Sequence, residues 1–191
     1  MTVDPVRQRI LEGTFACVAR RGLARTTVED AAREAGVARA TVYRHFPGGK
    51  EQLLSDVIAW ETARFFHRLA VAVEGTGDFT GLLEEGLRYA HRAVADHTVL
   101  QQVLRTEPGR LLPTLTIESN RIRQQIRAFL VPHLLAEPRL RPGLSAEEAS
   151  EYVSRMLLSW IEAPGRWDLD DPQQVAQLVR TVFLAGVLVA G

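Results

Sequence analysis

Hydrophobic residues recur every three or four positions along nearly the whole chain. No segment shows the sustained polar and apolar alternation, bounded by hairpin turns, that strands require. The pattern predicts an all-α protein. We expect a first helix that ends at residues 20–22, a short one after residue 26, a third at about 39–45 and a long one from about 51. Further helices are expected at about 79–96, 98–106, 115–136, 146–163 and 172–189.

Local signals set the helix ends. Asp4-Pro5 and Asp171-Pro172 each place an N-cap residue before a proline at the first helical position. Capping boxes are expected at Ser145–Glu148 and at Thr26–Glu29, where the Thr26 hydroxyl and the Glu29 carboxylate would satisfy the first turn. Gly36 stands where a left-handed cap ends a helix. Helix breaks are expected at Pro47-Gly48-Gly49, Gly75–Asp78, Pro108-Gly109, Pro138–Gly143 and Pro164-Gly165.

Composition describes an ordinary globular chain. Hydrophobic residues make up 46% of the 191 residues, enough to bury a core. The single cysteine, Cys17, cannot form an intramolecular disulfide and lies in an apolar-periodic stretch, where we expect it to act as a small core hydrophobe. The start has no signal-peptide pattern, and the longest apolar run is far shorter than the roughly 20 residues of a membrane helix. We therefore expect a cytoplasmic protein with no membrane partner.

Charge is distributed unevenly although the formal net charge is zero. Residues 1–50 hold nine Lys and Arg against five Asp and Glu, a net charge of +4, whereas residues 51–191 hold fourteen against eighteen, a net charge of −4. A short segment with its own positive charge is a candidate surface for phosphate.

The third helix carries residues suited to DNA. Two short helices joined by a glycine turn, after a longer first helix, can present the last helix to a major groove. Arg39 has the length and the donors to read guanine O6 and N7, and Ala40 is small enough for close approach or contact with a thymine methyl. Val42 and Phe46 should face inward. Groups that can donate to phosphate oxygens are carried by Thr41, Tyr43, His45 and, at the start of the fourth helix, Lys50.

A family resemblance rests on this stretch. The segments Thr26-Thr27-Val28-Glu29-Asp30-Ala31-Ala32, Ala35-Gly36-Val37, Thr41-Val42-Tyr43-Arg44-His45-Phe46 and Lys50-Glu51-Gln52-Leu53-Leu54 resemble the DNA-binding domain of the tetracycline-repressor (TetR) family over about residues 5–60. The resemblance implies a homodimer that binds double-stranded palindromic operator DNA. It also implies base-reading or groove-facing positions at Arg39, Ala40 and Arg44, and phosphate contacts at Thr27, Thr41, Tyr43, His45 and Lys50.

Two positions depart from the family pattern. Ala38 stands where a serine often caps the recognition helix, which removes a cap worth about 1 kcal/mol. Three residues, Pro47-Gly48-Gly49, separate Phe46 from Lys50, where many members have two, and this changes the placement of Lys50. The predicted organisation is a DNA-binding domain over residues 1–50, with its helix-turn-helix motif at about 27–46, and a regulatory and dimerisation bundle over residues 51–191.

The predicted bundle suggests a ligand cavity and a dimer interface. The long fourth helix, which begins near Lys50, is a candidate lever between the two parts. Candidate ligand-binding residues are Trp60, Phe66, Tyr89, Phe129 and Trp160, for which ordinary core packing is the alternative. The last predicted helix is apolar on nearly all sides, so it either joins a four-helix interface or fills the protomer's own core. Candidate interface residues are Tyr152, Met156, Trp160, Val179, Val182, Phe183 and Gly186.

The function favoured by the sequence is a DNA-binding transcriptional regulator, more specifically a repressor that a small, apolar effector releases from its operator. Two alternatives remain open: an all-helical small-molecule enzyme or carrier, and a dimeric DNA-binding protein without an effector. No metal site, cofactor site or catalytic constellation is expected, because the histidines are scattered and no nucleophile stands beside a base.

Overall fold

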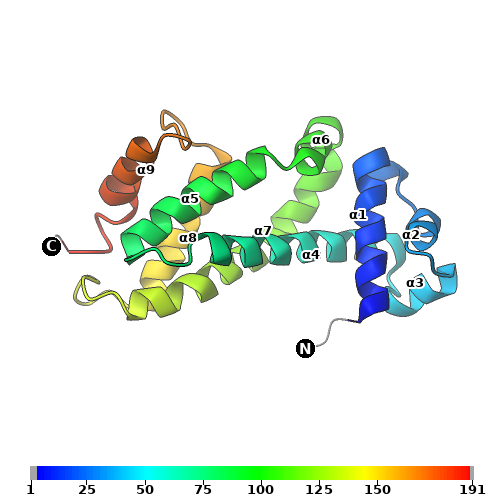
Figure 1. Cartoon of the computed structure of the whole chain (residues 1–191), viewed down its shortest axis with the longest axis horizontal. Coiled ribbons are helices and arrows are strands. Elements are labelled where there is room, and N and C mark those ends of the chain that lie inside the picture. The colour runs from blue at the N-terminus through cyan, green and yellow to red at the C-terminus, as the bar shows by residue number, and fades with distance from the viewer. Residues whose placement is uncertain (1–3, 190–191) are drawn as a thin grey trace. The chain divides into compact units, whose positions relative to one another are not determined.

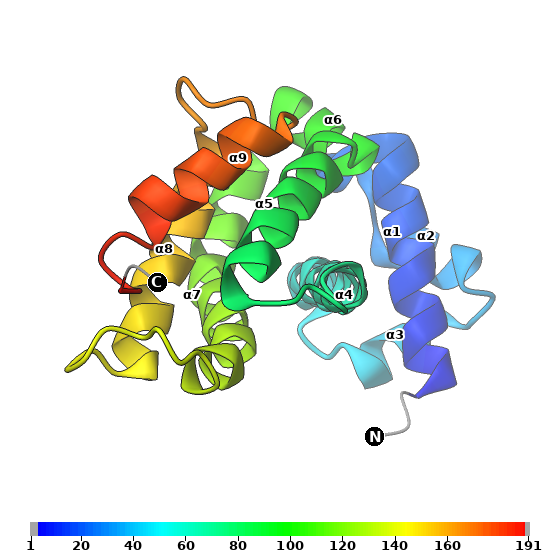
Figure 2. The same cartoon turned by 60° about the vertical axis from the view of Figure 1, so that its left-hand side comes forward.

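The computed structural model describes residues 4–189, and side-chain surroundings within this range except for residues 110–118 and 162. The described chain is almost entirely helical, with one isolated antiparallel bridge, Leu140 to Leu188, which confirms the predicted all-α class (Figures 1 and 2). Its elements are α1 (Pro5–Arg25), α2 (Val28–Glu34), α3 (Arg39–His45), α4 (Gly49–Ala72), α5 (Phe79–Ala95), α6 (Thr98–Thr106), α7 (Pro108–Leu135), α8 (Ala146–Glu162), α9 (Pro172–Leu178) and the π-helical turn η1 (Val179–Phe183).

The helices form two compact units. Unit 1 comprises the chain up to Phe65 together with His97–Glu118, and unit 2 comprises Phe66–Asp96 together with the chain from Ser119 onward. Helix α4 contributes residues to both units. The predicted boundary between residues 50 and 51 separates DNA binding from regulation and dimerisation. It stays a prediction.

Unit 1 is built around α1, α2 and α3, which lie together in Figure 1 as the blue and cyan helices. Asp4 caps α1 as predicted, because its carboxylate accepts from the backbone N–H groups of Val6 and Arg7. The core of these helices encloses Ile10, Leu11, Val42, Phe46 and Leu53. Helix α6 adds Val103, which packs with α1 residues Val18 and Leu23 in a second apolar cluster. Unit 1 is therefore made from two separate stretches of sequence.

The capping box of α2 lies one residue later than predicted. The Thr27 hydroxyl accepts from the backbone N–H of Asp30, and the Asp30 carboxylate accepts from the backbone N–H of Thr27. Thr26 instead points inward and donates its hydroxyl proton to the carbonyl oxygen of Gly22 at 2.7 Å. The cause is Gly22, whose backbone (φ 82°, ψ 173°) breaks the regular path of α1 and turns Thr26 toward the core.

The connection between α2 and α3 follows the sequence signals. Gly36 adopts the predicted left-handed conformation with φ 64°. Helix α3 has the predicted bounds, and Ala38 precedes it without a side-chain cap. Val42 and Phe46 are fully enclosed, so α3 is anchored by one face.

Unit 2 is a helical bundle with a continuous apolar core. Its fully enclosed side chains include Leu87 of α5, Leu130 and Leu134 of α7, and Leu178 of α9. Figure 2 shows α9 beside α5, in agreement with their contacts. The predicted caps at Ser145, with Glu148 closing its box, and at Asp171 are confirmed.

Two predicted helix bounds differ from the structure by several residues. The break after α6 falls at Glu107, and α7 begins at Pro108 instead of about residue 115; proline is tolerated at a first helical position because its missing N–H would lack a partner there. The last helix ends at Leu178 instead of residue 189. It passes through η1 and then leaves the helical path, because the backbone N–H of Arg141 donates to the Val187 carbonyl and that of Val189 donates to the Arg139 carbonyl, both at 2.9 Å.

No helix in the described part of the chain is both long and apolar enough to cross a membrane. Cys17 is buried as predicted, and burial raises the pKa of its thiol. A raised pKa keeps the thiol protonated and poorly nucleophilic at neutral pH.

Candidate nucleic-acid interface

Helix α3 presents one face to solvent because its other face is anchored in the core. Outside the buried Val42 and Phe46, the side chains of Arg39, Ala40, Tyr43 and Arg44 are all exposed, and Thr41 is half-buried. The helix is short, and its exposed face combines two cations, an aromatic hydroxyl and a small residue. Such a face offers long donors for base edges and hydroxyl donors for phosphate.

Arg39 has an ordered setting despite its exposure. Its Nη1 lies 2.8 Å from Oε1 of Glu29, a residue on the first turn of α2. Its Nη2 donates to the Tyr43 hydroxyl at 3.3 Å, and its Cζ lies 5.3 Å from the centroid of the Tyr43 ring. The hydrogen bond to Tyr43 and the nearby Glu29 carboxylate raise the pKa of Arg39. The guanidinium therefore stays charged and has a partner on each terminal nitrogen.

Lys50 lies in the first turn of α4 and contacts the end of α1. Its Nζ donates to the carbonyl oxygen of Ala24 at 2.8 Å. An ammonium group has three donors, so this bond leaves two for other acceptors. The extra residue in Pro47-Gly48-Gly49 therefore does not prevent the side chain from reaching the α1–α2 connection.

His45 and Thr27 are committed to contacts within the protein. The Nδ1 of His45 lies 3.4 Å from a carboxylate oxygen of Asp4, and its Nε2 is buried without a hydrogen-bond partner among the described residues. The Thr27 hydroxyl donates its only proton to the Asp30 carboxylate at 2.8 Å. Both residues, in this conformation, support the fold of unit 1, and a phosphate contact by either side chain requires a change of partner.

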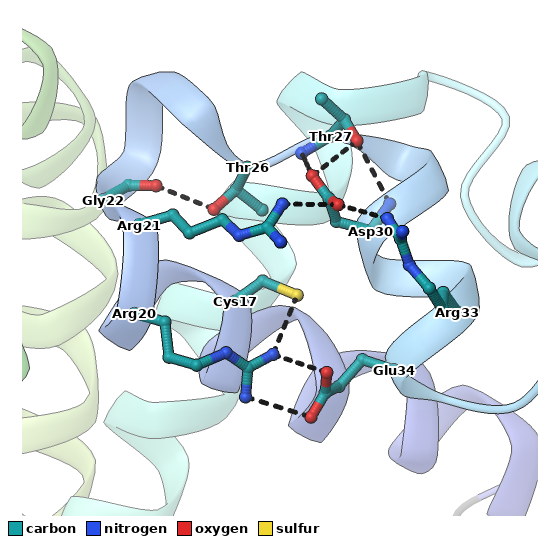
Figure 3. A network of polar contacts seen from close by, with 9 residues as sticks. All are labelled: Cys17, Arg20, Arg21, Gly22, Thr26, Thr27, Asp30, Arg33 and Glu34. Carbon is teal, nitrogen blue, oxygen red and sulfur yellow. Dashed lines mark hydrogen bonds and ion pairs between the residues drawn. The ribbon is translucent and has the colours of Figure 1, made fainter.

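A network of charges that local sequence signals do not reveal joins α1 and α2 (Figure 3). Asp30 lies between Arg21, whose Nη1 is 2.7 Å away, and Arg33 of its own helix. Arg20 forms a two-pronged ion pair with Glu34. In the sequence, Arg20 and Arg21 indicate only the end of a helix, because their partners lie on α2. The network fixes α2, and with it the N-terminal side of α3.

The Asp30 carboxyl group has a lowered pKa. The main cause is the hydrogen bond from the Thr27 hydroxyl, with the charges of Arg21 and Arg33 contributing, and desolvation opposes the shift. A pKa lower in the folded than in the unfolded state contributes stability above the unfolded value, about 3.9, and this contribution is lost as the pH falls through the folded value.

We expect Asp30→Asn to flatten the acid dependence of stability. Wild-type protein should lose part of its free energy of unfolding below about pH 4, where the carboxylate takes up a proton. The variant has no such proton to bind, so it should be less stable at pH 7 and should lose less on acidification. Urea midpoints at pH 7 and pH 3 measure both quantities, and parallel losses in the two proteins would contradict the assignment.

A second missed contact joins the start and the middle of the sequence within unit 1. The carboxylate of Glu107, at the end of α6, accepts from the backbone N–H of Ala24 at 2.7 Å. The carbonyl oxygen of Ala24 accepts from the ammonium group of Lys50. Both backbone polar groups of Ala24 are thus bound by charged side chains, which fixes the connection between α1 and α2.

Unit 2 contains a separate cavity of about 750 Å³. It lies at the junction of the α4–α5 and α7–α8 connections, and its wall is apolar on the side of Val73, Phe79 and Leu82. At its rim Arg139 pairs with Glu137 and Asp78, at 2.9 and 3.2 Å. The hydrogen bond from Arg139 lowers the pKa of the Glu137 carboxyl group, although burial opposes the shift.

The predicted ligand-binding residues are not gathered in this cavity. Phe129 lines it. Phe66 and Trp160 pack against the unit 2 core, and Tyr89 lies half-buried on α5. Trp60 belongs to unit 1, where the Cζ of Arg64 lies 4.7 Å from the centroid of its ring. Within the described residues, no group of His, Cys, Asp and Glu side chains is arranged to hold a metal ion.

The predicted dimer residues divide into core and surface. Val179 and Phe183 have no exposed surface, so they fill the core of their own protomer, which was the alternative for the last helix. Tyr152 is 41% exposed, and its hydroxyl donates to the Val182 carbonyl at 3.1 Å. Met156, Trp160 and Val182 are half-buried, and Gly186 is exposed.

Comparison with known proteins places unit 1 in context. A family model described as "Bacterial regulatory proteins, tetR family" matches residues 10–57. The chain is 26% identical over 190 residues to the HTH-type transcriptional repressor KstR2 of Mycobacterium tuberculosis H37Rv. The match covers 97% of this chain and 92% of the relative. It is 25% identical over 177 residues to the HTH-type transcriptional regulator AlkX of the same strain, covering 91% and 83%.

Solved structures show the same fold. The repressor AlkX from Dietzia sp. strain DQ12-45-1b matches with a TM-score of 0.67 at 21% identity and covers 94% of each chain. The repressor QsdR from R. erythropolis matches with a TM-score of 0.66 at 21% identity and covers 100% of this chain and 99% of that one. The likeness extends over both units.

Proposed function

Because the chain belongs to the TetR family of bacterial transcriptional regulators, we propose that the exposed face of α3 reads a palindromic operator. Members of this family bind operator DNA and act as dimers. We propose further that the protein represses transcription at this operator. The observation that supports this most directly is the division of α3 into two faces. Val42 and Phe46 bind it to unit 1, and Arg39, Ala40 and Arg44 face solvent beside a tyrosine hydroxyl. A recognition helix needs such an anchored back and a free front.

The proposed contacts divide into base reading and phosphate binding. Arg39 reads a guanine through O6 and N7, and Ala40 and Arg44 face the groove. Thr41, Tyr43 and Lys50 donate to phosphate oxygens on either side, where they set the register of the helix without reading sequence. Thr27 and His45 join them after exchanging their contacts with Asp30 and Asp4.

A homodimer places two such helices on one face of the duplex. We propose that the interface uses Tyr152, Met156, Trp160, Val182 and Gly186, supported from beneath by the buried Val179 and Phe183. Two half-sites one helical turn apart require the recognition helices to be about 34–36 Å apart. An inverted repeat with this spacing is therefore the expected operator.

The test is selection of bound sites from random duplexes, followed by binding of variants to the selected operator. Arg39→Ala should reduce discrimination at one base pair of each half-site by about 1–3 kcal/mol. Lys50→Ala should weaken binding to all sequences and lower the slope of log K against log salt by roughly one.

Arg92→Ala is the matched control, because it removes an exposed arginine of unit 2 that pairs with Asp170. It should bind the operator as the wild type does. Equal affinity of the wild-type protein for the operator and for a scrambled duplex would overturn the proposed function, and unchanged base preference in Arg39→Ala would overturn the role of that residue.

We further propose that a small, apolar effector binds in unit 2 and releases the operator. The cavity bordered by Phe129 supports this, since it combines an apolar wall with polar and charged groups, as ligand sites do. The shared helix α4 gives the two units a direct covalent connection. Release requires that the effector bind the two states of the protein with different affinity. Loss of operator binding on addition of apolar metabolites, measured by fluorescence anisotropy, tests the proposal.

A further inference from the structure

We propose that Glu29 is a positioning residue for base reading: its carboxylate, together with Tyr43, orients Arg39 before DNA arrives and disfavours binding to the wrong sequence. The inference rests on the proposed reading of a base by Arg39. Its basis is the contact of 2.8 Å between Oε1 of Glu29 and Nη1 of Arg39.

The two partners of Arg39 bind different nitrogens. Glu29 takes Nη1, and the Tyr43 hydroxyl takes Nη2 at 3.3 Å with the ring beneath the guanidinium. A guanidinium has five N–H groups. The Tyr43 hydroxyl accepts from one of them, and the contact with Glu29 is an ion pair, so enough donors are left for a bidentate pair with guanine. The arrangement thus holds the side chain without exhausting its donors.

Stability does not explain this contact. The side chains of Arg39 and Glu29 are 61% and 51% exposed, and exposed ion pairs contribute little to folding. Glu29 is itself well placed, because it lies in the first turn of α2, whose start is fixed by the Thr27–Asp30 capping box. A long side chain held by two partners loses less conformational freedom when it meets a base than one that moves freely.

The negative charge has a second effect. A carboxylate that faces the interface repels phosphate, so it weakens every complex in which Arg39 does not make its base contact. The correct operator compensates through the guanine pair, and other sequences do not. Glu29 therefore increases the ratio of specific to non-specific affinity.

The test is a double-mutant cycle on the selected operator, on operators with single base changes and on a scrambled duplex, at one salt concentration. Glu29→Ala should reduce discrimination at the base pair read by Arg39 by about three- to tenfold, in the range of couplings between side chains in contact. It should also bind the scrambled duplex more tightly. In the Arg39→Ala background, Glu29→Ala should cause no further loss of discrimination.

Two further variants separate orientation from charge. Glu29→Gln keeps an acceptor and removes the charge, so it should retain more base discrimination than Glu29→Ala while binding the scrambled duplex as tightly. Glu51→Ala removes another exposed carboxylate, on the first turn of α4, and should leave base discrimination unchanged.

The inference is overturned if Glu29→Ala leaves discrimination unchanged, or if it reduces discrimination equally with and without Arg39. These results differ from a failure of the proposed function, which shows itself as a wild-type protein without operator preference. They differ also from a failure of the Arg39 assignment, in which Arg39→Ala keeps full base preference. Melting temperatures close to the wild-type value establish that the exposed substitutions leave the fold intact.

Discussion

Phe46→Ala is expected to lower the free energy of unfolding by about 3–5 kcal/mol, the usual cost of removing a large aromatic side chain from a core. Phe46 has no exposed surface and closes the cluster that includes Ile10, Leu11 and Leu53. The cost combines lost burial with a cavity that the surrounding helices α1 to α4 cannot fill by small movements. Urea unfolding followed by circular dichroism measures it.

Tyr43→Ala is the control on the same helix. Tyr43 is 38% exposed and belongs to the proposed DNA-facing surface, so its loss should change stability far less. It should nevertheless weaken operator binding. Comparable losses of stability in the two variants would mean that α3 is not anchored by the face described above.

Gly22→Ala is expected to be the second strongly destabilising change. The backbone of Gly22 has φ 82° and ψ 173°, a region that residues with a Cβ adopt at a cost of about 1–3 kcal/mol. A Cβ at this position would also collide with a carboxylate oxygen of Glu107, so the end of this side chain must shift away. Any weakening of its hydrogen bond to the Ala24 N–H adds to the cost. The urea midpoint should fall accordingly.

Gly36→Ala separates the two contributions. Gly36 also has a positive φ, 64°, but a Cβ there meets nothing within 4 Å, so only backbone strain is added. In addition, Glu107→Ala should make Gly22→Ala less costly, because the collision is then absent. If Gly22→Ala cost no more than Gly36→Ala, the contact with Glu107 would have no energetic weight.

The sequence predicted most helix starts because their signals are local. Asp4, Ser145 and Asp171 each act within three residues, so the printed order of residues contains the whole interaction. The capping box at α2 was assigned one residue early because two threonines precede two acidic residues, and both registers satisfy the motif. Only the bend at Gly22, which sends the Thr26 hydroxyl to a backbone carbonyl, decides between them.

The end of the last helix had no comparable signal. The residues from Val179 onward are apolar on all sides, which predicts burial and is compatible with a helix of any length. The chain leaves the helix because backbone groups at Arg139 and Arg141, almost fifty residues earlier, pair with Val187 and Val189. Pairings over such distances are not visible in local periodicity.

The sequence predicted which residues of α3 form the candidate site, but not the residues on other helices that contact them. Arg39 and Tyr43 are four residues apart on one helix, so their shared face follows from periodicity. Glu29 had a plausible local role as a capping residue, and its contact with Arg39 exists only because α2 and α3 cross. Glu107 lies 83 residues from Ala24, where no spacing rule applies.

The bond between Glu107 and Ala24 has a consequence for hybrid regulators. The unit that carries the proposed recognition helix is discontinuous in the sequence, since α6 and its C-cap residue supply apolar contacts and an acceptor to α1. A chimera that grafts residues 1–50 onto a foreign effector bundle would leave the Ala24 amide without its carboxylate and Leu23 without Val103. Transplanting the DNA specificity of this protein therefore calls for grafting α6 as well, or for a recipient whose own helix ends in a carboxylate at the same place.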